Sequence, residues 1–543
     1  MDSIYLARPT RAQVAWADME LGLFIHWFPM GWYQDIDEGR LLQPEYQQEL
    51  LARCTCDTLD TDQWVQSAQD LGAQYLVFVA KHALGFCAWQ TEHGQFGMKQ
   101  VPYQKGQGDV VRDLAASCRK AGIKLGIYLA ADTMVMDVGQ QGIARDPAFQ
   151  EEYNRIYRAW LTELLSRYGE VVEVWFDGSL QIEVGDILKQ YAPHAMVFQS
   201  RYATIRWVGQ EEGYASDPAW NSVERYDALS GIATQRHGTP EGQVWLPLEC
   251  DARIRRDWGY HHNLADNPIK SVDQLMDMYY GSVGRGAVLL LNQAPHPKGH
   301  IIPEDMARMK EFGDEIRARF RNRLGTVKGE GMALELHLPE PGPVDHVILM
   351  EDIRFGERVR AYRVEAMVAG DWVQVSSGIA VGHKKIDAFP EITTDRLRFT
   401  ALQTAGTPIL RAFTALYAGR IPVRKLAAAP HQEVVMEFGS QIYDHRTGHA
   451  DFSLALSPFI REAGQYRLAF RLTPDSRDPL VLSEARLMIG GIPQPDYLTK
   501  EDADNSFLLY IPGTGPEVVF TAGSTRGSVP SLKGDVVIER VIP

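Results

Sequence analysis

The sequence predicts a (β/α)8-type barrel of parallel strands, followed by C-terminal β-sandwich domains. Within about the first 320 residues, short apolar segments typical of buried strands alternate with segments of helical period. Beyond residue 330, apolar and polar residues alternate one by one, and Gly and Pro recur at short intervals, which is typical of antiparallel sheets. A chain of 543 residues is also too long for one hydrophobic core, so several domains are expected.

The predicted barrel begins with a strand over residues 22–27. A helix is predicted over 63–71 because its apolar residues recur on one face. Thr61 or Asp62 can cap this helix, and Gly72 can end it.

The same alternation continues along the chain. A strand over 74–80 is followed by a helix that Asp109 caps and Gly122 ends, and then by a strand over 123–129. The remaining predicted elements are a helix at 150–168, strands at 171–176, 195–199, 244–248 and 287–291, and a closing helix at 303–321. No glycine-rich phosphate loop follows any of these strands, so a barrel fits better than an open dinucleotide-binding sheet.

Three domains are expected from the changes of pattern. Residues 1–325 form the barrel, residues 326–420 a β-sandwich, and residues 431–543 a second β-rich domain of unknown role. The segment at 421–430, with its prolines and alanines, is the predicted linker between the last two.

Charge and cysteine content limit the classes of function. A net charge of -15 argues against nucleic acid or an anionic membrane as the main partner. No apolar run approaches 18 residues, so no membrane-spanning helix is predicted. The five cysteines have no zinc-binding spacing and favour reduced thiols, so no metal is expected. Because the N-terminus lacks a basic segment followed by an apolar one, we expect a cytoplasmic protein.

Polar residues at the ends of successive strands indicate an active site, because the parallel strands of a barrel end at one edge. The most informative is Asp177, which closes the apolar segment 171–176; an ordinary Asp-Gly turn is the alternative. The other strand-end residues are His26, His82, Tyr128, Arg201 or Arg206, Glu211 and Glu249. Their imidazole, guanidinium and phenol groups can bind sugar hydroxyls, and a pair of carboxyl groups can cleave a glycosidic bond. The candidates for the second carboxyl are Glu211, Glu212, Glu249, Asp251 and Asp257.

Several short segments resemble the retaining α-L-fucosidases of glycoside hydrolase family 29. They are Gly22-Leu-Phe-Ile-His-Trp27, Tyr75-Leu-Val-Phe-Val-Ala-Lys-His82, Gly126-Ile-Tyr128, Val174-Trp-Phe-Asp-Gly178, Trp258-Gly-Tyr260 and Leu290-Leu-Asn292. The resemblance extends into the predicted sandwich through residues 351–359. It implies a hydrolase that acts on fucosylated oligosaccharides or glycoconjugates and needs no cofactor. A homo-oligomer, in which a neighbouring subunit completes the pocket, is left open.

The resemblance also implies roles for individual residues. Asp177 would be the nucleophile, and His26 and His82 would bind fucose hydroxyls. Tyr128 and Trp175 would line the pocket, the latter near the methyl group of the sugar. The predicted substrate-binding set is completed by Trp32, Trp258, Arg201 and Arg206.

The acid/base residue follows from a further segment. Arg206-Trp-Val-Gly-Gln-Glu-Glu-Gly213 resembles an Arg-Trp-x-Gly-Asn-Glu-x-Gly segment of the linkage-selective branch of the family. This resemblance maps the acid/base onto Glu211, and Glu249 is the alternative.

Two positions depart from the family pattern. The usual Lys-His-His-Asp-Gly-Phe has Ala83 in place of its second imidazole, and the usual Glu-Trp-Tyr has Gly31 in place of its glutamate. Asp35, Asp37 or Glu38 can replace that carboxylate. Each lost charge-assisted hydrogen bond costs about 1.5–3 kcal/mol, so the preferred sugar is open. The alternatives are a glycosidase for a related L-sugar, such as an α-L-galactoside, and a non-catalytic sugar-binding barrel.

Overall fold

The chain divides into two compact units, Met1–Val423 and Arg424–Pro543. The structure is a computed structural model that describes residues 6–225, 238–419, 432–438, 449–456, 459–460, 464–472, 481–489, 492–494, 498–500, 506–511, 518–525 and 534–541. Among these residues, no helix is both long enough and apolar enough to cross a membrane.

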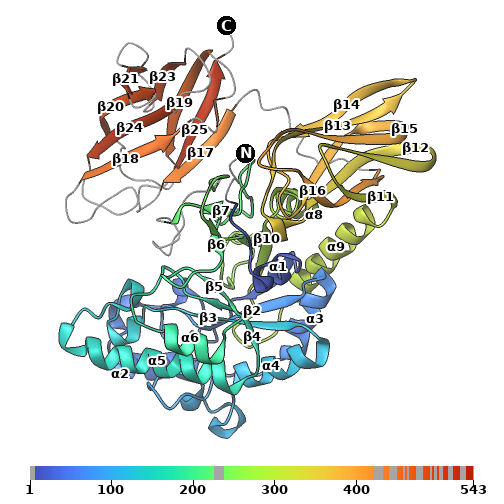
Figure 1. Ribbon diagram of the computed structural model, residues 1–543. Helices are drawn as coiled ribbons and strands as arrows, with labels where there is room; N and C mark the ends of the chain where they lie inside the picture. The colour runs from blue at the N-terminus through green and yellow to red at the C-terminus, as the bar shows by residue number, and fades with distance from the viewer. Residues whose placement is uncertain are drawn as a thin grey trace. The chain divides into compact units, whose positions relative to one another are not determined.

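Eight parallel strands form a barrel in the first unit, in the order β5-β4-β3-β2-β1-β10-β9-β6. The neighbouring strands β2, β3, β4 and β5 are labelled in Figure 1. A parallel bridge between Phe198 and Ile205 links the two outer strands of this order. The prediction of a (β/α)8-type barrel is therefore confirmed. The strands are β1 (Leu21–Ile25), β2 (Tyr75–Lys81), β3 (Lys124–Leu129), β4 (Val171–Trp175), β5 (Met196–Phe198), β6 (Arg206–Trp207), β9 (Leu248–Arg253) and β10 (Val288–Gln293).

Amphipathic helices occupy most of the connections between these strands. The main ones are α3 (Thr61–Leu71), α4 (Val110–Ala121), α5 (Gln150–Arg167), α6 (Gly185–Tyr191), α8 (Val272–Gly281) and α9 (Pro303–Phe320), with α1 (Arg11–Ala17) before β1 and α2 (Pro44–Ala52) after it. Gly72 and Gly122 end their helices in the left-handed conformation, as predicted, with φ of 90° and 72°.

The sequence predicted the N-terminal caps of two helices, α3 and α4. Asp109 accepts a hydrogen bond from the amide of Arg112 at 2.8 Å and caps α4, as predicted. The cap predicted for α3 is wrong, because Asp60, with extended backbone, accepts from the amide of Gln63 at 3.1 Å. Thr61 already belongs to the helix.

The strand predicted over 244–248 is also wrong. Its first residues form β8 (Val244–Trp245), which pairs with β7 (Ser222–Val223) in a separate antiparallel ribbon. Pro247 has no N–H for a ladder and interrupts the segment. The barrel strand β9 begins after it, at Leu248.

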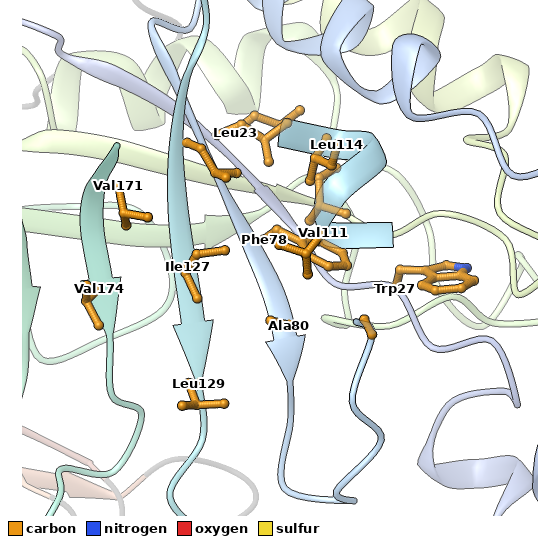
Figure 2. Close-up of a cluster of buried hydrophobic side chains, with 14 of the residues drawn as sticks. Leu23, Trp27, Phe78, Ala80, Val111, Leu114, Ile127, Leu129, Val171 and Val174 are labelled. Atoms are coloured by element: carbon orange, nitrogen blue, oxygen red, sulfur yellow. The ribbon is translucent and has the colours of Figure 1, made fainter. Parts of the chain in front are cut away.

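Side chains of the barrel strands alternate between two hydrophobic cores. Phe78 of β2 and Ile127 of β3 face outwards and form one cluster with Val111 and Leu114 of α4, as Figure 2 shows. The intervening residues face inwards and fill the barrel; they include Phe24, Tyr75, Val77, Tyr128, Trp175, Phe198 and Leu290. This period of two is the reason why the strand-end residues at one edge converge.

The first unit continues into one antiparallel sheet in the order β11-β16-β12-β15-β13-β14. Its strands are β11 (Arg323–Glu330), β12 (Ala333–Glu351), β13 (Val359–Val368), β14 (Asp371–Gly378), β15 (Lys385–Thr404) and β16 (Ile409–Leu416). His383 and Arg411 contact the Asp18 carboxylate at 2.8 and 2.7 Å, and Lys384 contacts Glu20 at 2.7 Å. These contacts hold the sheet against the loop that leads into β1.

The second unit contains two antiparallel sheets, in the orders β17-β25-β19-β23-β22 and β18-β24-β20-β21. Its strands are β17 (Gln432–Phe438), β18 (His449–Ala455), β19 (Gly464–Leu472), β20 (Val481–Ile489), β21 (Ile492–Pro493), β22 (Leu498–Lys500), β23 (Ser506–Ile511), β24 (Val518–Thr525) and β25 (Gly534–Val541). Phe507 of β23 and Phe520 of β24 pack with ring centroids 5.0 Å apart, so the two sheets share one core. The predicted fold class, a barrel followed by C-terminal β-sandwich domains, is confirmed. The sequence had placed a sandwich at 326–420, where the structure has a single six-stranded sheet, and had predicted only a β-rich domain for 431–543.

Candidate active site

Asp177 lies just beyond the end of β4, at the carboxyl edge of the barrel. Its Oδ2 accepts a hydrogen bond of 2.9 Å from the hydroxyl group of Tyr128 on the neighbouring strand β3. The residue as a whole is exposed, yet protein atoms surround its carboxylate densely. Burial raises the pKa of Asp177 to about 6, and the charges of Asp132 and Glu211 act in the same direction against the Tyr128 hydrogen bond.

His26 follows β1 and has one defined tautomer. Its Nδ1 lies 2.8 Å from Asn292 Oδ1, and the Asn292 amide nitrogen donates to the carbonyl of Trp258 at 2.9 Å. The second contact fixes the amide orientation, so His26 Nδ1 must donate and Nε2 keeps its lone pair. Burial lowers the pKa of His26 well below its ordinary value, so the ring is neutral.

His82 follows β2 and is also neutral. Burial, assisted by the positive charge of Lys81, lowers the pKa of His82 to about 3. Its Nδ1 lies 2.7 Å from the hydroxyl group of Tyr33, and its ring is stacked on that of Tyr128 with centroids 5.6 Å apart. Two neutral imidazoles therefore lie beside Asp177, with ring centroids 5.9 Å apart.

Aromatic rings form the walls around these polar groups. Trp175 is stacked on Phe198 at 3.7 Å and on Tyr128 at 5.6 Å. Trp32 lies against Gly259, where an added Cβ would meet the indole ring at 2.1 Å. Glycine is therefore required next to Trp258 for Trp32 to reach this position.

Glu211 is brought to the same edge from the loop that follows β6. The indole N–H of Trp258 donates to Glu211 Oε2 at 3.0 Å, and Arg253 contacts the same oxygen at 3.2 Å. The Glu211 side chain is 44% exposed, so solvent and ligand can reach it. Its neighbour Glu212 contacts another nitrogen of Arg253 at 3.4 Å and is 64% exposed.

Glu249 lies in a different place. It is fully buried inside the barrel, where its carboxyl oxygens accept from the Trp175 indole at 2.8 Å and the Tyr75 hydroxyl at 3.1 Å. A general acid must reach the oxygen of the leaving group. This position argues against the alternative that Glu249 is the acid/base.

Asp251 and Asp257, the other two candidates for the second carboxyl group, have contacts of their own. Asp251 is buried and accepts from the indole of Trp207, and burial raises its pKa well above the ordinary value. Asp257 contacts His261 at 2.8 Å.

The two arginines predicted to bind substrate have structural contacts instead. Arg201 is exposed and forms an ion pair with Glu183. Arg206 is 1% exposed and donates to the backbone carbonyl of Trp220. The structure groups the other six predicted binding residues with Asp177 and Glu211 and leaves these two outside the group.

The structure shows what lies beside Gly31 and Ala83, the two positions that depart from the family pattern. Gly31 has a φ of 102°, and an added Cβ would lie 2.7 Å from Asp35 Oδ2, so the Asp35 carboxylate occupies the adjacent space. Asp37 instead accepts from the amide of Gly39. The carbonyl of Ala83 accepts from the amide of Met134 at 2.8 Å, so the loop after β3 lies against that position.

Sequence reasoning did not assign a role to several residues of this site. Asn292 and Tyr33 stood in segments that resemble the family, and only the structure shows that each contacts a histidine. No sequence pattern pointed to Arg253 or Asp132. Arg253 contacts Glu211, and the charge of Asp132 acts on Asp177, only because the fold brings distant segments together.

A parallel barrel whose carboxyl edge presents two carboxyl groups among neutral imidazoles and aromatic rings has the arrangement of a glycoside hydrolase. Comparison with known proteins identifies the family. A sequence model described as Alpha-L-fucosidase matches residues 7–318, more than half of the chain. Alpha-L-fucosidase 1 of Arabidopsis thaliana is 29% identical over 467 residues, which cover 76% of this chain and 88% of that protein.

Solved structures agree with this match. A putative α-L-fucosidase from Bacteroides thetaiotaomicron is 31% identical, covers 76% of this chain and 100% of its own, and superposes with a TM-score of 0.68. A Ruminococcus gnavus GH29 fucosidase in complex with fucose is 23% identical and shares the fold over 76% of this chain and 96% of its own, with a TM-score of 0.65. The chain belongs to the α-L-fucosidase family, glycoside hydrolase family 29. The family and the glycoside hydrolase class predicted from the sequence are thereby confirmed.

Proposed function

We propose that the protein is a retaining α-L-fucosidase that removes terminal α-L-fucosyl residues from oligosaccharides or glycoconjugates. Asp177 attacks the anomeric carbon while Glu211, as an acid, protonates the leaving oxygen. Glu211 then acts as a base, takes a proton from water and lets the hydroxide displace Asp177 from the fucosyl-enzyme. The observation that carries this proposal is the convergence of the two carboxyl groups. Trp258 donates to Glu211 and Tyr128 donates to Asp177, and the His26 ring lies 5.0 Å from the Trp258 ring and 6.0 Å from the Tyr128 ring.

The proposed nucleophile must be ionised to attack. With a pKa of about 6, the Asp177 carboxylate is ionised at neutral pH, and the Tyr128 hydrogen bond favours this form. Activity is therefore expected to fall as the pH decreases through 6.

Fucose recognition is assigned to the neutral histidines and the aromatic walls. His26 Nε2 keeps a lone pair for a sugar hydroxyl, because Nδ1 donates to Asn292. The apolar surface of Trp175 suits the methyl group of the sugar. The fucose complex of the Ruminococcus gnavus relative supports the choice of sugar.

The test uses aryl α-L-fucosides and two variants. Asp177→Ala is expected to abolish turnover, because it removes the carboxylate that would form the covalent intermediate. Glu211→Ala is expected to lose activity and to recover with azide, which needs no general base and yields a fucosyl azide. Appreciable turnover by Asp177→Ala would contradict the nucleophile assignment, and a normal rate of Glu211→Ala without azide would move the acid/base role elsewhere.

A panel of substrates decides between the sugars. The departures at Gly31 and Ala83 fall where the family resemblance expects groups that bind the sugar, so an aryl α-L-galactoside is measured beside the fucoside. Higher kcat/KM on the galactoside would replace the proposed substrate. Binding of fucose without hydrolysis of either glycoside would identify a sugar-binding barrel instead.

A further inference from the structure

Two carboxyl groups lie in the interior of the barrel, beneath the proposed active site. They belong to Glu173 on β4 and Glu249 on β9, and both residues are fully buried. Glu249 accepts the indole N–H of Trp175 on one oxygen at 2.8 Å and the hydroxyl group of Tyr75 on the other at 3.1 Å. Glu173 Oε2 accepts the indole N–H of Trp16 from helix α1 at 2.7 Å. The two acids are therefore anchored to two indoles and a phenol.

The two acids also influence each other through their charges. Burial raises the pKa of Glu173 to about 7 and that of Glu249 well above its ordinary value, and the charge of Glu173 acts on Glu249 in the same direction. Among the described residues, no N–H or hydroxyl group donates to Glu173 Oε1. Burial therefore favours the protonated form of the acids in this layer.

Glycines in the neighbouring strands make room for this pair. A Cβ on Gly22 would lie 2.4 Å from the ring of Tyr75, and a Cβ on Gly126 would lie 2.8 Å from Val77 and 3.4 Å from Glu173. Both glycines have ordinary negative φ, so close packing rather than backbone conformation requires them. The close packing of the neighbouring strands thus accommodates the two buried acids.

Trp175 connects this layer to the sugar pocket. Its stacking on Phe198 at 3.7 Å and Tyr128 at 5.6 Å fixes the plane of the indole. Stacking alone leaves open which edge of the ring faces the barrel interior, since an apolar face has no directional donor. The hydrogen bond from the indole N–H to Glu249 makes that choice, because the alternative would take the buried N–H away from this acceptor and leave one Glu249 oxygen without a donor.

We propose that Glu249 is a positioning residue that fixes the edge of Trp175 in the sugar pocket and thereby sets affinity for the substrate. This inference rests on the proposed function, in which Trp175 contacts the fucosyl group.

The experiment compares Glu249→Gln with Glu249→Ala on an aryl α-L-fucoside. Glutamine keeps an oxygen for the Trp175 N–H, so KM should stay within about threefold of wild type. Alanine removes the acceptor of the Trp175 N–H together with that of the Tyr75 hydroxyl group, and KM should rise about tenfold while kcat changes by less than about threefold. If the alanine variant does not fold, Glu249→Met fills the volume without accepting a hydrogen bond and gives the same comparison.

A matched control and a second background show whether the change in KM acts through Trp175. Glu163 is also buried and accepts an indole N–H, from Trp89 at 2.9 Å, so Glu163→Ala should lower stability and leave KM unchanged. In a Trp175→Phe background, Glu249→Ala should add no further increase in KM, because the donor is already absent. An unchanged KM in Glu249→Ala, or an equal increase in both backgrounds, would overturn the inference. Wild-type protein that fails to hydrolyse any fucoside would instead contradict the proposed function.

Discussion

The hydroxyl group of Tyr128 donates to Asp177 Oδ2 at 2.9 Å, across the adjacent strands β3 and β4. This bond opposes the burial that raises the pKa of Asp177 to about 6. Burial raises the pKa of Tyr128 itself well above its ordinary value, so the phenol remains a donor over the whole working range of pH. The pair thus keeps the proposed nucleophile ionised in a site that disfavours charge.

Tyr128→Phe is expected to shift the acid limb of kcat/KM to higher pH. The hydrogen bond favours the ionised form, so its loss raises the pKa of Asp177 and reduces the fraction of active enzyme at a given pH. At pH 6 we expect a loss of about tenfold in kcat/KM. Tyr33→Phe is the control, because its hydroxyl group contacts His82 instead. An acid limb that stays in place in Tyr128→Phe would contradict the role of the bond.

Asn292→Ala is expected to weaken substrate binding through His26. Without the Asn292 acceptor the ring can adopt either neutral tautomer, and Nε2 no longer keeps its lone pair for the sugar in every molecule. KM should rise about tenfold with a smaller change in kcat. Asn263→Ala, which removes an exposed amide bonded to Asp266, should leave both constants unchanged.

Trp258→Phe is expected to impair acid catalysis while keeping an aromatic wall. The variant loses the N–H that donates to Glu211 Oε2 at 3.0 Å, so the carboxyl group is held less firmly. A leaving group that needs protonation depends on this geometry more than an activated one does. The loss of kcat should therefore be about tenfold on a fucosyl disaccharide and smaller on a dinitrophenyl fucoside; equal losses on both would contradict the argument.

Asp35→Ala is expected to raise KM for the fucoside by about tenfold. The Asp35 carboxylate fills the space beside Gly31, and among the described residues its buried Oδ2 accepts no hydrogen bond. His262 lies 3.6 Å from this oxygen, beyond hydrogen-bonding distance. Asp37→Ala provides the matched control, since Asp37 is exposed and only caps a turn at Gly39. If the two variants have the same KM, Asp35 does not replace the missing glutamate.

Asp18→Asn is expected to remove part of the acid sensitivity of folding. Hydrogen bonds and ion pairs with His383 and Arg411 lower the pKa of Asp18 to about 2 against the opposing effect of burial. A carboxyl group with a lower pKa in the folded protein than in the unfolded one stabilises the fold. This stabilisation is present above the unfolded pKa of about 4 and is lost as the pH falls towards 2. Because the side chain is 46% exposed, we expect a loss of only about 1 kcal/mol in unfolding free energy at pH 7.

Urea denaturation of wild type and Asp18→Asn at several pH values checks this expectation. The difference between the two proteins should shrink as the pH falls from 5 to 2, since both then lack the charge of Asp18. A difference that stays constant with pH would show that packing, and not ionisation, is responsible.

The sequence predicted the elements whose signals are local. Alternating apolar segments, Asp109 as a cap and Gly122 as a helix end depend on neighbouring residues, and the structure has them where the pattern indicated. The error at 244–248 has a local cause as well, because Pro247 divides an apolar segment that periodicity alone treats as one strand. The two-residue strand β6 was too short to produce a pattern.

The site divides in the same way. Asp177, His26 and His82 follow strands directly, so strand order and family resemblance together were enough to place them at one edge. The sequence by itself determined the barrel, the terminal sandwich and the family. Only the tertiary structure decided that Glu211 reaches the pocket through Trp258 while Glu249 lies beneath it. The direction in which a side chain points, and how deep it lies in a closed barrel, depend on the register between strands that are far apart in the chain. No local sequence pattern contains this register.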